Sequence, residues 1–259
     1  MEAILVERGD GDEGVVTVTL NRPEKRNALN PQMAFELLDT FRAIAARPED
    51  RVLVLTGAGD GFCSGADLTG GEGRGTHALV YMRTIGSVAL ALQTLPKPTI
   101  AKVHGVAAGA GCNMALACDL VVASDAARFT QIFVKRGMVV DFGGSWLLPR
   151  LVGMQRAKEL AFFGDFVSAA DAQGIGLVNR VLADGDLDAF VDEWAERLAA
   201  GPPLALSMTK SLLSHSFETS IEQALEDEAR CQAVCLGTKD TREAIKAFAA
   251  KRPPIFRGH

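Results

Sequence analysis

Apolar residues along the first half of the chain follow two alternating patterns, one typical of buried strands and one typical of helices. Short apolar runs rich in branched residues lie at 4–7, 15–20, 51–56, 99–103 and 120–123. Between them, apolar residues recur with helical spacing at 31–46, 78–95 and 110–117. Continuous apolar strands that alternate with helices are typical of layered α/β folds with parallel strand pairing. The sequence therefore predicts an α/β fold.

The second half of the chain has mainly helical patterns. We expect helices at 148–163, 168–172, 187–200 and 204–217, followed by one long helix at 221–250. The tripeptide Gly201-Pro202-Pro203 interrupts this series, and glycine next to proline commonly marks a connection. We therefore predict a core of residues 1–200 and a C-terminal helical region of residues 201–259.

Composition and charge narrow the possible partners and location. Hydrophobic residues make up 48% and charged residues 23%, as in ordinary globular proteins. The net charge of −5 argues against a nucleic-acid or anionic-membrane surface. No uncharged apolar stretch reaches the roughly 18–20 residues that span a bilayer, and no long apolar segment follows the acidic N-terminus. We expect a cytoplasmic protein that binds neither nucleic acid nor membrane.

The five cysteines are expected to be reduced thiols, because their number is odd and they are widely spaced. Cys231 and Cys235 stand four residues apart but have no histidine or second cysteine pair beside them. We expect them to pack between helices, and we predict no metal site.

Two loops rich in small residues follow predicted strands, at 57–68 and 104–112. The second contains Gly109-Ala110-Gly111 but lacks the third glycine of a dinucleotide fingerprint, and neither loop has the Gly-Lys-Ser or Gly-Lys-Thr of a P-loop. Small residues let backbone N–H groups approach a ligand closely, so a pair of donors for a negatively charged oxygen is the preferred interpretation. Turns that only pack a helix on a strand are the alternative.

Asp141 lies in a run of apolar residues and glycines from 137 to 149, in which Ser145 is the one other polar side chain. Burial raises the pKa of a carboxyl group, and such a group can move protons between carbon atoms near neutral pH. Alternatively, Asp141 caps a helix at 145–151, since aspartate is a favoured N-cap residue. The residues alone leave both interpretations open.

Nucleophilic catalysis has little support. Ser64 has Phe62 and Ala66 where a nucleophile elbow has glycines, and neither Cys63 nor Cys112 has an evident histidine partner.

Four segments together resemble motifs of the enoyl-CoA hydratase/isomerase (crotonase) superfamily: residues 21–30, 62–68, 104–119 and 247–252. The resemblance implies a spiral of ββα units with a C-terminal helical trimerisation region. It also implies trimers that often pair into hexamers. The implied substrate is an acyl-CoA thioester, with no separate cofactor because coenzyme A is part of the substrate.

The resemblance also implies roles for individual residues. The backbone N–H groups of Ala66 and Ala110 would hold the thioester oxygen, and Lys251 would reach the phosphates of coenzyme A from the same or a neighbouring subunit. The residues expected to contact coenzyme A are Lys25, Arg26, Ala28, Asp67, Leu68, Phe248 and Lys251.

Hydratases of this superfamily use two glutamates, and this chain has Asn113 and Phe133 at those positions. An amide is no general base near neutral pH, and a phenyl ring transfers no proton. Asp141 falls where some isomerase members keep their acid, in a context that resembles bacterial Δ3,Δ2-enoyl-CoA and 1,2-epoxyphenylacetyl-CoA isomerases. The resemblance implies an isomerase that uses Asp141 alone. Phe133, Phe142 and Trp146 would line its acyl pocket, exclude water and raise the pKa of Asp141.

Two alternatives remain. The first is a hydratase-type enzyme with atypical catalytic residues, and the second is a non-catalytic acyl-CoA-binding protein. The missing glutamates favour the second, whereas the isolated Asp141 disfavours it.

Overall fold

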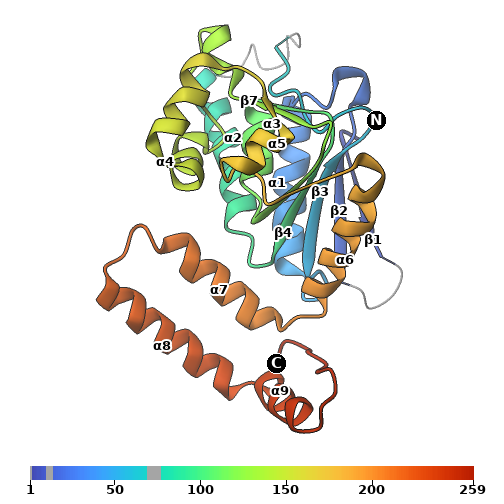
Figure 1. Cartoon of the computed structure of the whole chain (residues 1–259), viewed down its shortest axis with the longest axis vertical. Coiled ribbons are helices and arrows are strands. Elements are labelled where there is room, and N and C mark those ends of the chain that lie inside the picture. Colours follow the sequence, from blue (N-terminus) through green and yellow to red (C-terminus); the bar gives the residue numbers. More distant parts are fainter. Residues whose placement is uncertain (1, 10–13, 69–76) are drawn as a thin grey trace.

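The computed structural model describes residues 2–9, 14–68 and 77–259 (Figure 1). The strands are β1 (Ile4–Arg8), β2 (Val15–Leu20), β3 (Val52–Gly57), β4 (Thr99–Val103), β5 (Val106–Ala108), β6 (Leu120–Ser124), β7 (Arg128–Thr130), β8 (Val167–Ser168) and β9 (Arg180–Leu182). The α-helices are α1 (Pro31–Ala46), α2 (Ala78–Gln93), α3 (Ala110–Leu116), α4 (Gly144–Phe163), α5 (Ala169–Gly174), α6 (Leu187–Ala199), α7 (Pro203–His215), α8 (Ile221–Gly237) and α9 (Lys239–Ala249). Short 3-10 helices cover Pro23–Lys25, Ile132–Arg136 and Asp184–Asp186.

Strands of the described residues form two sheets. The larger has the order β1-β2-β3-β4-β6-β9 and is parallel except between β1 and β2. The smaller has the order β5-β7-β8, and β5 directly follows β4 in the chain. The predicted strands of the larger sheet are present. The sequence patterns missed β5, β7, β8 and β9, each of three residues or fewer.

Helices cover both faces of the larger sheet, which explains its continuous apolar strands. On β3, Leu53 and Leu55 pack in the core that includes residues of α1 and α2. The alternate residues Val52 and Val54 pack against α6 on the other face. Figure 1 shows α6 and α1 on opposite sides of the sheet.

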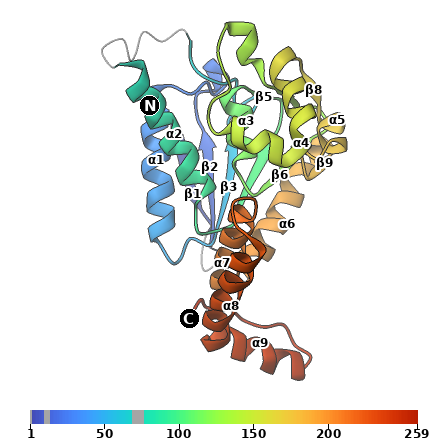
Figure 2. The ribbon, with the colours of Figure 1, turned by 90° about the vertical axis from the view of Figure 1, so that its left-hand side faces the viewer.

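Helices α7, α8 and α9 extend away from the α/β core in both views (Figures 1 and 2). The predicted single helix at 221–250 is wrong, because α8 ends at Gly237 and α9 starts at Lys239. Thr238 between them is extended (φ −78°, ψ 158°), and its side chain accepts a hydrogen bond from the N–H of Thr241 as the N-cap of α9. Gly201 and Pro202 fall between α6 and α7, and the independence of residues 201–259 as a domain stays a prediction.

The chain's end folds back onto the start of α9. Asp240 is buried, and its carboxylate accepts hydrogen bonds from the N–H groups of Arg257 and Gly258 at 2.7 and 2.8 Å. Arg51 of the core donates to the carbonyl oxygen of Phe256 at 3.1 Å. The C-terminal segment thus joins α9 to the core. In the described part of the chain, no helix has the length and apolar character needed to cross a membrane.

Candidate active site

The two loops rich in small residues lie against each other through their backbones. The N–H of Cys63 donates to Val106 O at 3.0 Å, and the N–H of Ala108 donates to Cys63 O at 2.9 Å. A Cβ atom on Gly111 would lie 2.4 Å from Cys63 O, and one on Gly65 would lie 2.9 Å from Ala108 O. Only glycine permits these two approaches.

Ala66 and Ala110 each follow a glycine with a positive φ, Gly65 (φ 99°) and Gly109 (φ 53°). Ala110 is the first residue of α3, where helical N–H groups have no partner within the helix. Within residues 2–9, 14–68 and 77–259, no hydrogen bond uses the backbone N–H of Ala66 or of Ala110. Both N–H groups are thus unpaired within the described residues, as the proposed pair of donors requires.

The segment that resembles the N-terminal motif packs on the first loop. Leu29 N–H donates to Gly65 O at 2.7 Å, and Asp67 N–H donates to Leu29 O at 2.9 Å. Arg22 forms an ion pair with Asp67 at 2.8 Å and also donates to Ala28 O. Sequence reasoning missed Arg22, because its partner is 45 residues away and no local pattern connects them.

Asp141 lies in the loop that leads into α4, two residues before the N-cap of that helix. The helix-cap interpretation is wrong: the N-cap residue of α4 is Gly143, and no side chain caps that helix. Oδ1 of Asp141 is buried, and no hydrogen-bond partner reaches it in the described residues. Burial raises the pKa of Asp141 from 3.8 to about 6. A carboxylate in this state is suited to proton transfer near neutral pH.

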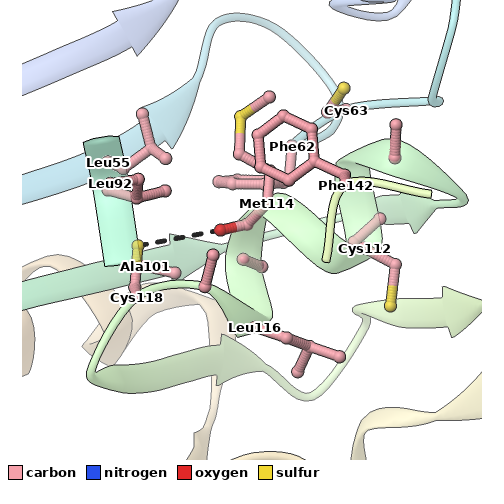
Figure 3. Close-up of a cluster of buried hydrophobic side chains, with 14 of the residues drawn as sticks. Leu55, Phe62, Cys63, Leu92, Ala101, Cys112, Met114, Leu116, Cys118 and Phe142 are labelled. Atoms are coloured by element: carbon pink, nitrogen blue, oxygen red, sulfur yellow. Dashed lines mark hydrogen bonds between the residues drawn. The ribbon is translucent and has the colours of Figure 1, made fainter. Parts of the chain in front are cut away.

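The residue after Asp141 anchors the loop in the core. Phe142 is 2% exposed and has a positive φ of 50°, which is unusual for a bulky residue. Figure 3 shows its ring beside Phe62 and Met114 in the cluster of buried side chains. The buried ring fixes the backbone next to Asp141.

The two positions at which hydratases carry glutamates hold no titratable group. Asn113 is fully buried, and its amide bonds to Gln131 Nε2 and to the backbone carbonyl of Asp141, each at 2.8 Å. Phe133 is also buried, with its Cζ 3.5 Å from where a Cβ on Gly109 would stand. Neither position can therefore supply an acid, whereas Asp141 lies next to Asn113 and Asp67 is paired with Arg22.

A cavity of about 590 Å³ lies between α2, the start of α4 and α7. Phe142 and Trp146 line it, but Phe133 does not, so the structure brings together two of the three predicted acyl-pocket residues. Trp146 Nε1 donates to Glu218 at 3.1 Å, and the Arg150 guanidinium lies 3.9 Å from the centre of the indole. These contacts connect the start of α4 to the loop after α7.

Tyr81 on α2 is a neighbour of the site that sequence reasoning missed. Burial raises its pKa most, and the negative charges of Asp141 and Asp67 raise it further. Its position near two acids from distant segments has no signal in the sequence.

The cysteines near the loops are not activated. Burial raises the pKa of Cys63 to about 11 and that of Cys112 to about 12, so both stay thiols at neutral pH. In the described part of the chain, no group of three or more His, Cys, Asp or Glu side chains is arranged to hold a metal ion.

The residues expected to contact coenzyme A fall into two groups. Lys25 and Arg26 are exposed on the segment that packs against the first loop, Ala28 is buried beneath them, and Leu68 is exposed nearby. Phe248, which is 87% exposed, lies on α9, at the opposite end of the molecule from α3 (Figure 1). Lys251 follows α9, so the two groups do not meet within one chain.

The sequence profile described as enoyl-CoA hydratase/isomerase matches residues 10–259. The chain belongs to the enoyl-CoA hydratase/isomerase family. Among its relatives, the 1,2-epoxyphenylacetyl-CoA isomerase of Escherichia coli is 37% identical over 252 residues, which cover 95% of this chain and 96% of the relative. The crotonyl-CoA hydratase of Syntrophomonas wolfei is 34% identical and is matched over 98% of both chains.

Solved structures agree with this family. The crystal structure of enoyl-CoA hydratase from Bacillus anthracis matches 99% of this chain and 100% of its own, with a TM-score of 0.93 and 32% identity. The predicted resemblance and the crotonase-like α/β fold with a helical C-terminal region are confirmed. The protein is thus an enzyme of the enoyl-CoA hydratase/isomerase family, and its relatives' names include both hydratases and an isomerase.

Proposed function

We propose that this enzyme isomerises an acyl-CoA thioester and that Asp141 is its proton carrier. The observation that carries the proposal is the Asp141 carboxyl itself, which is partly buried, lacks a hydrogen-bond partner at its buried Oδ1 within the described residues, and has a pKa of about 6. Asn113 and Phe133 leave no acid at the two glutamate positions. Hydration would need a second acid/base group besides Asp141, and these two positions do not supply one.

The mechanism needs one acid and two N–H donors. The thioester oxygen binds between the N–H groups of Ala66 and Ala110, which stabilise negative charge on that oxygen. Ionised Asp141 takes a proton from the carbon next to the carbonyl, and a dienolate forms. Asp141 then returns the same proton two carbons further along, so the double bond moves and no water is consumed. Loop and helix N–H groups of this kind typically contribute about 3–4 kcal/mol each to such a step.

Coenzyme A is expected to lie along Lys25, Arg26 and Leu68, with Phe248 and Lys251 supplied by a neighbouring subunit. Large apolar side chains exposed on α4, α7, α8, α9 and their connections support self-association, and the family resemblance implies a homotrimer or a pair of trimers. They include Met154, Phe162, Phe163, Leu213, Phe217, Ile221 and Phe248. Light scattering coupled to size-exclusion chromatography tests this assembly, and a monomer at micromolar concentration would contradict it.

The decisive experiment replaces Asp141 with asparagine. Asp141→Asn should lower kcat for conversion of a 3-enoyl-CoA to the 2-enoyl-CoA by about 10³-fold, while the Kd for the thioester changes little. Asp165→Asn is the matched control, because Asp165 is an exposed partner of Lys135. Near-normal turnover by Asp141→Asn would refute the proposal, and the same screen should include a ring-epoxide CoA thioester.

A hydratase is the second candidate, because relatives such as the Syntrophomonas wolfei enzyme carry that name. Crotonyl-CoA tests it directly. Hydration of crotonyl-CoA that is faster than isomerisation of a 3-enoyl-CoA would favour the hydratase over the isomerase. Tight binding without turnover of any thioester would instead indicate a non-catalytic acyl-CoA-binding protein.

A further inference from the structure

Asn113 connects the helix of one proposed oxyanion donor to the backbone of the proposed proton carrier. It lies on α3, three residues after Ala110, and its side chain is fully buried. Nδ2 of Asn113 donates to the carbonyl oxygen of Asp141 at 2.8 Å. The N–H of Gly144 donates to the same oxygen at 2.9 Å. Two donors from different segments therefore hold the peptide group of Asp141.

The chemistry of the partners fixes the orientation of the amide. A backbone carbonyl oxygen only accepts hydrogen bonds, so Asn113 must present its NH₂ group to Asp141. Its Oδ1 then faces Gln131, which donates from Nε2 at 2.8 Å. The Asp141 carbonyl oxygen thus requires the Asn113 amide in one orientation, the Gln131 amide is compatible with it, and burial keeps water from competing.

The neighbouring glycine makes room for this contact. A Cβ atom on Gly144 would lie 2.3 Å from Asn113 Nδ2 and 2.6 Å from a Val140 methyl group. The φ of Gly144 is not in the left-handed region, so the space taken by Asn113 and Val140 is the reason for glycine here. The first residue of α4 therefore packs directly against the Asn113 amide.

We propose that Asn113 is a positioning residue, which sets the place of the Asp141 carboxylate relative to the Ala110 N–H. The inference rests on the proposed function of Asp141. An ionised glutamate could not do this work, because a carboxylate has acceptors only and would face the Asp141 carbonyl oxygen. Asn113 thus replaces a hydratase glutamate and also supplies a hydrogen-bond donor that glutamate would lack.

Two variants of Asn113 test the inference. Asn113→Asp keeps the size and still accepts from Gln131, but in its ionised form it lacks the donor to Asp141. Asn113→Ala removes the donor without adding charge. Both should lower kcat for 3-enoyl-CoA isomerisation by 10- to 100-fold, since small displacements of a catalytic group have effects of about this size. The Kd for the thioester should stay within about two-fold, because the hydrogen bonds of the Asn113 side chain within the described residues go to Asp141 and Gln131 rather than to the proposed binding groups.

Two further variants complete the experiment. Gly144→Ala pushes on the same amide without altering it and should also lower kcat more than it raises Kd. Asn179→Asp is the control, because Asn179 is exposed and only accepts from the N–H of Val121, a bond that aspartate keeps. Its kcat should match that of the wild type.

The outcomes separate the inference from the proposed function. If Asp141→Asn is inactive but every folded variant at Asn113 and Gly144 keeps kcat within three-fold, the positioning role is overturned. A parallel loss of kcat and thioester binding in these variants also overturns it, since general damage to the fold would cause both. If Asp141→Asn is active, the proposed function fails regardless of Asn113. Should Asn113→Asp not fold, Asn113→Ala and Gly144→Ala decide.

Discussion

Arg22 and Asp67 form an ion pair that joins two segments 45 residues apart, with 2.8 Å between Nη2 and Oδ2. Both side chains are largely buried, at 16% and 7% exposure. Arg22 also donates to the carbonyl oxygen of Ala28, so it bridges the N-terminal segment and the loop that carries Ala66. The position of the Ala66 N–H therefore depends on a side chain outside the loop.

Replacing this arginine should affect both stability and activity. Arg22→Met keeps much of the aliphatic volume but removes the charge from beside the buried Asp67 carboxylate. Breaking such a pair typically costs about 3 kcal/mol of folding free energy. We expect a clear fall in Tm and a several-fold fall in kcat because the Ala66 loop loosens. Arg42→Met is the control, since Arg42 is 67% exposed and 4.0 Å from Asp39. Equal Tm values for the two variants would contradict this role.

The raised pKa of Asp141 predicts the pH dependence of activity. The proposed reaction begins with the ionised carboxylate, whose pKa is about 6. Activity measured as kcat/KM should therefore be level above that pH and fall about tenfold per unit below it. Initial rates on a 3-enoyl-CoA between pH 5 and 8 check this. A profile that stays flat down to pH 5 would exclude Asp141 as the titrating base.

The same shift predicts how stability depends on pH. The folded-state pKa of Asp141 lies above its ordinary value of 3.8, so the folded protein binds this proton more tightly than the unfolded chain. The resulting stabilisation is present below pH 3.8 and is lost as pH rises through about 6. Asp141→Asn should thus unfold at a higher temperature than the wild type at pH 8. Its free energy of unfolding should be larger by on the order of 1–2 kcal/mol after allowance for partial solvent exposure. The difference should shrink at pH 4, and a gain that is equal at both pH values would contradict the assignment.

A proline at position 110 tests the second proposed oxyanion donor. Ala110 is the first residue of α3, where proline is tolerated because its missing N–H has no helical partner. Ala110→Pro should lower kcat by about 10²- to 10³-fold through loss of that donor. Circular dichroism should show the fold retained. Wild-type kcat in the folded variant would remove Ala110 from the mechanism.

The buried carboxylate of Asp240 should hold the chain's end in place. Asp240→Ala leaves the N–H groups of Arg257 and Gly258 without their acceptor, at an expected cost of about 2 kcal/mol. Trypsin should then cleave after Arg257 faster than in the wild type. Asp184→Ala changes an exposed aspartate and serves as the control. Unchanged cleavage and Tm in Asp240→Ala would show that other contacts hold this segment.

Apolar patterns predicted the larger sheet and most helices because those elements bury long runs of side chains. They failed at Thr238, since apolar spacing continues on both sides of it while its own side chain starts a new helix. They also missed β5, β7, β8 and β9, which are too short to show a period. Local propensity carries little information over two or three residues.

The candidate site was only partly predictable, because its contacts join distant segments. Asp141 stood out as a lone acid among apolar residues, and the small residues of the two loops indicated close backbone approach. The contact between Asn113 and Asp141 spans 28 residues, and the pair of Arg22 and Asp67 spans 45. No periodicity or motif spacing connects such partners, so only the folded chain reveals them.

The close approach of Gly111 to Cys63 has a consequence for how this enzyme can change over evolution. Backbone atoms, rather than side chains, set the spacing of the two loops that carry Ala66 and Ala110. Substitutions in the cavity wall, such as at Trp146, should therefore reshape the cavity without disturbing that spacing. If the proposed roles hold, the cavity wall and the spacing of the two loops can be changed independently, because they depend on different atoms.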